Sequence, residues 1–272
     1  MIDVILDFND RSTQIDKYLK FIWIIDNSDN LVGLPPMPDK RILFDNGVEL
    51  KLQDIAIEGI PYRIDSELVK ILKSNTLLLL YNLIEGTISA LMNEFFSTIS
   101  SESKTFDEFE FPVKRIWLNY KHRLFSVGQT KKEGYIIDAI ENIINESVVI
   151  VPKSITDHEL GTRTLHNYEA YIAETQSNEI SGNLDARQIR ILFELYGLPV
   201  LNPRCDAMLR VKNKRNSLAH GNETFAQVGS NFTVEELFRM KHEITGFIEH
   251  LLNSTKDFIR DKKYLKTPPV IV

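Results

Sequence analysis

The chain has 272 residues, of which 43% are hydrophobic and 26% are charged, and its formal net charge is -6. This is the composition of a folded protein, with enough apolar residues for one large core or two smaller ones. Glycine and proline are scarce, at 12 and 10 residues, which favours long helices over glycine-punctuated sheets. The acidic balance excludes a general nucleic-acid coat protein, so contact with RNA would need a local basic patch.

The sequence argues against secretion and against membrane insertion. The single cysteine, Cys205, cannot form an internal disulfide, and no basic segment followed by an apolar one opens the chain. The most apolar stretch, residues 77–96, is interrupted by Asn and Glu residues that would be costly in hydrocarbon. We therefore expect a cytoplasmic protein without a membrane span.

A helix, a small β insert and a second helix are expected first along the chain. Apolar residues three and four apart predict a helix over residues 12–25. Two short extended runs then flank an Asn-Gly pair, which predicts a β hairpin in an insert near residues 41–62. Asp65 or Ser66 is suited to cap the next helix, whose long apolar sequence predicts a place at the centre of the core.

The middle of the chain is partly assignable. Helical patterns cover residues 113–125 and 133–145, with a polar, glycine-flanked linker between them. A short strand-like run opens residues 148–181, but the polar sequence that follows has no clean period. Most of that stretch stays unassigned.

The last part of the chain is expected to be helical. Asp185 is suited to cap a helix that a Gly-Leu-Pro sequence ends. Two further helices, over about residues 204–219 and 233–263, form a helical hairpin that spans residues 204–263. The final residues, 266–272, read as a disordered tail.

The helix over residues 204–219 carries a charge where a core residue is expected. Its apolar stripe consists of Met208, Val211, Leu218 and Ala219. Arg215 falls within this stripe, and burying an unpaired charge costs several kcal/mol. The arginine therefore needs a carboxylate, a cluster of carbonyls, a partner subunit or a phosphate, which indicates a site.

His220 follows Arg215 by five residues, beside Gly221, which is suited to end the helix. Its imidazole is expected at the C-terminal edge of the helix, near the arginine. Five cations lie within residues 204–215 and form a local attractor for phosphodiester. The candidates for phosphate binding among them are Arg210, Lys212 and Lys214.

These residue types suit cleavage of RNA by its own 2′-hydroxyl group. His220 would move the proton as general base or acid, and Arg215 would stabilise charge developing on the phosphoryl oxygens. Neither role needs a metal ion or another cofactor, and the histidines show no metal-ligand spacing.

The segment from Arg215 to His220, Arg-Asn-Ser-Leu-Ala-His, resembles the Arg-x4-6-His motif of HEPN domains, where a polar residue such as Asn216 usually follows the arginine. Ser-Asn-Thr at 74–76 with Leu-Tyr-Asn-Leu-Ile-Glu at 80–85, and Gly-Asn-Leu-Asp-Ala-Arg at 182–187, resemble MAE-type HEPN nucleases of bacterial toxin and defence loci. The resemblance covers most of the chain. It implies a mainly α, HEPN-like helical bundle as a single domain over residues 1–272, with insertions.

The resemblance further implies a homodimer in which two Arg-His motifs form one metal-independent endoribonuclease site acting on RNA. Such an enzyme would be a toxin or a phage-defence effector, with a neutralising antitoxin or a second defence protein as a partner. In some HEPN proteins an acidic or amide residue of the long preceding helix joins the site. Asn82 and Glu85, three residues apart on that helix, are the candidates here.

Other interpretations stay open. A catalytically inactive HEPN module would bind RNA or a partner protein, because a fold and a motif can outlive an activity. A plain helical scaffold would present its cations to solvent and pair Arg215 internally. Cys205 lacks the local signature of a nucleophile, whereas Phe225, in the polar segment after the motif, is the aromatic residue best suited to stack on a base.

Overall fold

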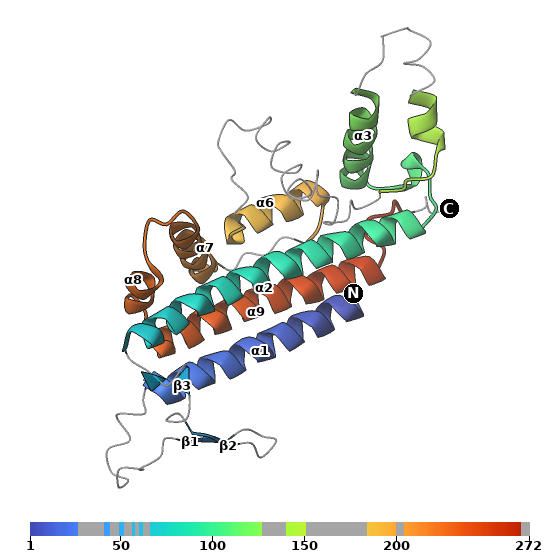
Figure 1. The fold of residues 1–272 in the computed structure, drawn as a ribbon. Helices are drawn as coiled ribbons and strands as arrows, with labels where there is room; N and C mark the ends of the chain where they lie inside the picture. Colours follow the sequence, from blue (N-terminus) through green and yellow to red (C-terminus); the bar gives the residue numbers. More distant parts are fainter. Residues whose placement is uncertain are drawn as a thin grey trace.

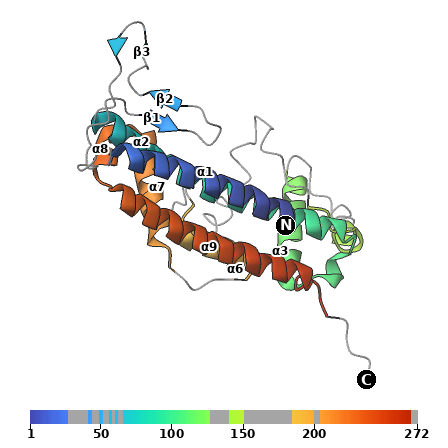
Figure 2. The same ribbon diagram turned by 90° about the horizontal axis from the view of Figure 1, so that it is seen from below.

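The computed structural model describes residues 1–26, 66–126, 140–150, 184–199 and 204–267, and four short strands at 41–43, 49–51, 56–57 and 60–61. Three long helices, α1 (Ile2–Asp26), α2 (Ser66–Ser101) and α9 (Val234–Arg260), run side by side (Figures 1 and 2). The predicted mainly α fold is confirmed. None of the described helices is long and apolar enough to cross a bilayer.

Helix α2 forms the centre of the core, as its sequence predicts, and contacts both α1 and α9. It is apolar on nearly all sides, which is typical of a buried helix. Its fully buried side chains include Leu77, Leu80, Ile84, Ile88 and Leu91. The helix begins at Ser66, one of the two residues predicted to cap it, and the other, Asp65, lies outside the described residues.

Helix α1 begins at Ile2, earlier than the predicted start at residue 12. The prediction was wrong because the polar residues near its N-terminus hide the apolar stripe. In the structure that stripe continues from Ile15 back through Phe8 to Val4, all of them buried. The intervening polar residues face outward, where Arg11 donates a hydrogen bond to Asp7 at 3.0 Å.

The predicted β insert is confirmed as two antiparallel pairs. Strand β1 (Arg41–Leu43) pairs with β2 (Glu49–Lys51), and β3 (Ala56–Ile57) pairs with β4 (Ile60–Pro61). The Asn-Gly turn that predicts the first hairpin lies outside the described residues.

The middle of the chain follows the predicted helices where it is described. The 3-10 turn η1 (Phe106–Glu108) precedes α3 (Phe111–Ser126), which begins two residues before the predicted 113–125. Residues 140–145 are helical, and the preceding part of the pattern predicted over 133–145 lies outside the described residues. The strand-like start at 148 forms no strand through residue 150, and residues 151–183 also lie outside.

Helix α6 (Ala186–Tyr196) starts and stops where its sequence predicts. The Asp185 carboxylate accepts hydrogen bonds from the backbone N–H groups of Arg187 and Gln188, both at 3.0 Å. At the other end, Gly197 has a φ of 67°, and the Leu198 N–H donates to the Phe193 carbonyl at 2.9 Å. These bonds satisfy backbone groups that a helix end leaves open.

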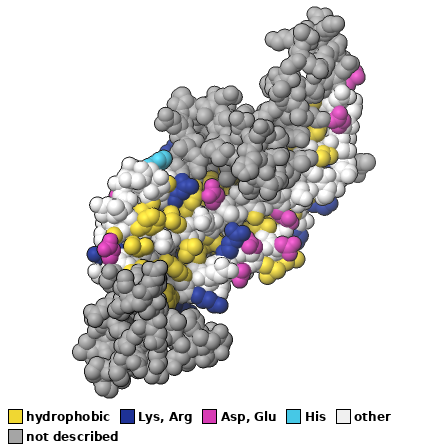
Figure 3. All heavy atoms as spheres, viewed as in Figure 1, with side chains coloured by type: hydrophobic (Ala, Val, Ile, Leu, Met, Phe, Trp, Pro, Cys, Tyr) yellow, Lys and Arg dark blue, Asp and Glu magenta, His cyan; other side chains and the backbone are white. Residues whose placement is uncertain are grey.

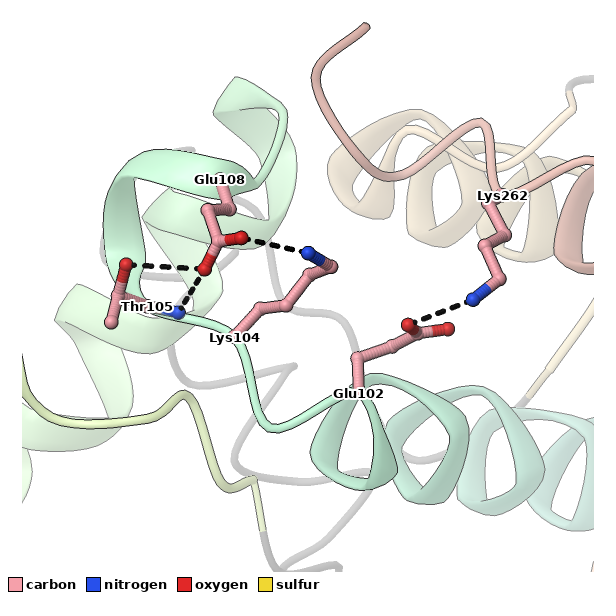
Figure 4. Close-up of polar contacts among 5 residues, drawn as sticks. All are labelled: Glu102, Lys104, Thr105, Glu108 and Lys262. Atoms are coloured by element: carbon pink, nitrogen blue, oxygen red, sulfur yellow. Dashed lines mark hydrogen bonds and ion pairs between the residues drawn. The ribbon is translucent and has the colours of Figure 1, made fainter. Parts of the chain in front are cut away.

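The segment after α9 is held at the end of α2 by a side-chain pair (Figure 4) and at η1 by a backbone hydrogen bond. The Lys262 ammonium donates to Glu102 at 2.9 Å, and a separate pair joins Lys104 and Glu108 at 2.7 Å. The Lys266 N–H donates to the Glu108 carbonyl at 2.9 Å, within the stretch predicted as a disordered tail. Residues 268–272 of that tail lie outside the described residues.

Candidate functional site

Helix α7 (Asp206–Ala219) presents the predicted motif on the side of the bundle where it contacts α2 and α9. Ala207, Met208 and Val211 are buried and anchor its first half. Leu218 is partly buried against the core, whereas Ala219, predicted to share the apolar stripe, is exposed because it ends the helix. The motif therefore begins at a packed surface and ends in solvent.

Arg215 lies half-buried over an aromatic ring of α2. Its guanidinium carbon is 4.7 Å from the centroid of the Tyr81 ring, a distance at which a cation is attracted to the negative face of the ring. The sequence requires a partner for a cation on this stripe, and the structure supplies Tyr81. This residue was missed, because in a run of leucines a tyrosine reads as one more core residue.

Asn216 touches the arginine directly. Its side-chain oxygen accepts a hydrogen bond from the Arg215 Nη1 at 3.2 Å, and its carbonyl accepts one from the His220 backbone N–H at 2.9 Å. The two predicted residues Arg215 and Asn216 are thus in contact. Asn216 also links the arginine to the backbone of the histidine through the last helical turn.

His220 closes α7 with its side chain exposed. Gly221 follows in the left-handed conformation, at a φ of 69°, and its N–H donates to the Leu218 carbonyl at 3.2 Å. The Asn222 N–H donates to the Ser217 carbonyl at 2.9 Å, which completes a Schellman motif. The imidazole is therefore carried by a fixed turn at the end of the helix.

The Glu223 carboxylate links the chain after this turn to α7. Glu223 accepts hydrogen bonds from the Lys214 ammonium on both of its oxygens, each at 2.9 Å. The Ser217 hydroxyl and then Lys214 hold the pKa of Glu223 below its ordinary value. Glu223 thus ties the segment after His220 back to the helix that carries Arg215.

The predicted phosphate-binding cations each have a partner within the chain. Lys212 forms an ion pair with Asp185, the residue that caps α6, and Lys214 pairs with Glu223. The guanidinium carbon of Arg210 lies 5.2 Å from the centroid of the Phe232 ring. Two of the three cations therefore face a carboxylate, whereas Arg210 is exposed and stacked on a ring.

The two candidates on α2 lie beside Tyr81. Glu85 follows Tyr81 by one helical turn and is half-buried, so it shares the edge of α2 above which Arg215 lies. Asn82 is exposed and is turned further round the helix than Glu85. The geometry associates Glu85 with Arg215 more closely than Asn82.

Helix α8 (Phe225–Ser230) was not predicted, yet it fixes the chain beyond the motif. It begins with a capping box in which Thr224 and Gln227 bond to each other's backbone, and it packs on α2 through Gly229. Its first residue, Phe225, is 38% exposed. The capping box was visible in the sequence, but a helix of six residues is too short to show a helical period.

Apolar side chains are exposed among Lys, Arg, Asp and Glu side chains on one face of the helical bundle (Figure 3). On the helix that carries the motif and on the helix that follows it, the large exposed apolar side chains are Leu209 of α7 and Phe225 of α8. We call these two residues the apolar rim. The end of the bundle that carries the motif therefore offers both apolar contact area and charge.

Cys205 precedes α7 and is buried, and burial raises its pKa to about 12. A thiol in this state is protonated at neutral pH, which agrees with the absence of a nucleophile signature in the sequence. Within the described part of the chain, no three His, Cys, Asp or Glu side chains converge as metal ligands do.

Comparison with known protein families gives one match. The family model described as MAE_28990-like HEPN matches residues 3–264, which is nearly the whole chain. No curated protein and no solved structure matches the chain.

Proposed function

Because the chain belongs to the MAE_28990-like HEPN family, whose domains are nuclease-like, RNA-related modules, we propose that it is a metal-independent endoribonuclease. The observation that carries the proposal is the geometry of the Arg215 to His220 segment. The Arg215 guanidinium lies over the Tyr81 ring and donates a hydrogen bond to the Asn216 side chain. The His220 imidazole is exposed on the turn that ends the same helix. One residue can stabilise negative charge and the other can move protons.

The reaction uses the hydroxyl group of the substrate as nucleophile. The 2′-oxygen attacks the adjacent phosphorus, the bond to the 5′-oxygen of the next nucleotide breaks, and a 2′,3′-cyclic phosphate and a 5′-hydroxyl result. His220 accepts the proton of the 2′-hydroxyl or donates one to the leaving 5′-oxygen. Arg215 stabilises the charge that develops on the phosphoryl oxygens, with Asn216 holding it and Glu85 and Asn82 supporting from α2.

A homodimer supplies the second motif in this proposal. The apolar rim lies on α7, which carries the motif, and on α8, which follows it, so a second copy packing there would bury apolar area and bring two histidines into one cleft. One His220 could then act as base while the other acts as acid. The proposal assigns the enzyme to the cytoplasm as a toxin or phage-defence effector, with an antitoxin or second defence protein as its partner.

A catalytically inactive HEPN module that binds RNA or a protein is the second candidate. The ion pairs of Lys212 and Lys214 favour it, because cations that already face carboxylates contribute less to phosphate binding. In an active enzyme these lysines would exchange their partners for phosphate, or Arg210 and Arg215 would carry the RNA contact alone.

Cleavage of labelled RNA in EDTA tests the proposal. The wild type should cut, whereas Arg215→Ala and His220→Ala should cut at least about 100-fold more slowly, with light scattering showing the same dimer for each. Arg239→Ala and His250→Ala are matched controls, because they remove the same side-chain types from exposed positions on α9, and they should cut like the wild type. RNA binding without cutting by the wild type would favour the inactive module, and equal cutting by all variants would refute the assignment.

A further inference from the structure

Tyr81 is a buried ring that lies beneath the flexible side chain of Arg215. The ring is 1% exposed, and its neighbours on the same helix, Leu77, Leu80 and Ile84, are fully buried. An arginine side chain has several rotatable bonds and loses much rotamer freedom when it is held in one geometry. A ring that cannot move, 4.7 Å below the guanidinium carbon, restricts the arginine to the space above it.

The ring holds the arginine by a different kind of contact from those of the neighbouring cations. Lys212 and Lys214 each face a carboxylate, which offsets their charge. An aromatic face attracts a cation through its quadrupole, without contributing a net negative charge. The Tyr81 ring therefore orients the Arg215 guanidinium without itself placing a negative charge beside it.

We propose that Tyr81 is a positioning residue for Arg215, which fixes the guanidinium where it meets the phosphoryl group. This inference rests on the proposed ribonuclease function. Preorganised charge contributes more in a transition state than charge that must first be ordered, so loss of the ring should lower kcat more than it raises KM. The phenol hydroxyl has no part in the effect, because the face of the ring carries it.

The first measurement is made on the wild-type protein by NMR. A guanidinium above a ring places its Nε–H proton in the shielding region, so the Arg215 signal should lie upfield of the Arg239 signal. The signal is assigned by its loss in Arg215→Ala. It should keep its position in Tyr81→Phe and move downfield in Tyr81→Leu. An Arg215 signal without an upfield shift in the wild type would overturn the proposal, whatever the variants do.

The second measurement is RNA cleavage by the same proteins. Tyr81→Phe should keep the wild-type kcat, whereas Tyr81→Leu should lose about 10-fold, which lies between the values for an exposed and a fully desolvated cation–π contact. Tyr196→Leu is the matched control: Tyr196 is 2% exposed and stacks edge-on against Phe96, so its loss removes a buried ring elsewhere in the core. It should leave kcat close to wild type.

A double variant separates positioning from general damage to the fold. If Tyr81 acts through Arg215, Tyr81→Leu should have no further effect in an Arg215→Ala background. Equal losses in Tyr81→Leu and Tyr196→Leu, or an undiminished effect of Tyr81→Leu without the arginine, would overturn the proposal. Absence of cleavage by the wild type would refute the ribonuclease function instead, and the NMR shift would still decide whether the ring holds Arg215.

Discussion

Gly229 lets α8 approach the backbone of α2 more closely than any other residue would. A Cβ atom built on Gly229 would lie 1.8 Å from the carbonyl oxygen of Lys70, 2.5 Å from its carbon and 2.9 Å from its Cα atom. All three are backbone atoms of the central helix, so no side-chain rotation relieves the clash. Gly229→Ala must push α8 away from α2.

The energetic cost follows from two opposing effects. Overpacking a well-packed contact costs about 1–3 kcal/mol, and a clash with backbone lies at the upper end. Replacing a helical glycine by alanine returns about 0.5–1 kcal/mol. We expect Gly229→Ala to lower the free energy of unfolding by about 2 kcal/mol, because Val228 and Phe232, buried on either side of the glycine, must move with α8.

Urea denaturation measures this loss, with Gly246→Ala as the matched control. Gly246 is on α9 with no atom within 4 Å of a built Cβ, so its replacement should stabilise the protein by about 0.5–1 kcal/mol. Because Thr224 directly precedes α8, Gly229→Ala should also shift the amide signals of Gly221. A Gly229→Ala protein as stable as the wild type would refute the close approach of α8 to α2.

Three further predictions concern residues around α7. Asp185→Ala should lower the free energy of unfolding by about 2–3 kcal/mol, since it removes the α6 cap and leaves Lys212 unpaired. Asp185→Asn keeps a capping side chain, so its loss, measured by urea denaturation, should be about 1 kcal/mol smaller. Cys205 is buried, so it should react with a thiol reagent only when the protein unfolds. Because folding raises the pKa of Cys205 from 9.0 to about 12, the free energy of unfolding should fall as pH rises above 9. Thermal melts at pH 8 to 11 measure this loss, with Cys205→Ala as the reference. Since the pKa of Glu223 is lowered from 4.5, its bonds to Lys214 should be intact above pH 4.5 and should be lost as pH falls further. The loss should appear as a pH-dependent shift of the Gly221 amide signal, and this shift should be absent in Glu223→Gln.

Local chemistry explains which parts of the fold the sequence predicts well. The ends of α6 follow from Asp185 and Gly197, because capping depends on residues within one helical turn. The long run of apolar residues in α2 predicts its central place. The start of α1 and the existence of α8 were missed, because polar residues obscure the period of α1 and α8 is too short to show one.

In the candidate site, too, the residues set by local sequence were predicted, whereas contacts between distant parts of the chain were missed. The order Arg215, Asn216, His220 and Gly221 is legible in the sequence because it belongs to a motif and to a helix end. Tyr81 was not found, because its contact with Arg215 joins two helices far apart in the chain and leaves no local signal. The carboxylate partners of Lys212 and Lys214 were missed as well, since each lies beyond the reach of one helical turn.

The most direct test of the account compares two substrates of one sequence, RNA and its 2′-O-methyl counterpart, with wild-type protein in EDTA. Only the RNA should be cut, and its products should carry 2′,3′-cyclic phosphate and 5′-hydroxyl ends. Cutting of the 2′-O-methyl substrate, or cutting that appears only when a divalent metal ion is added, would contradict it.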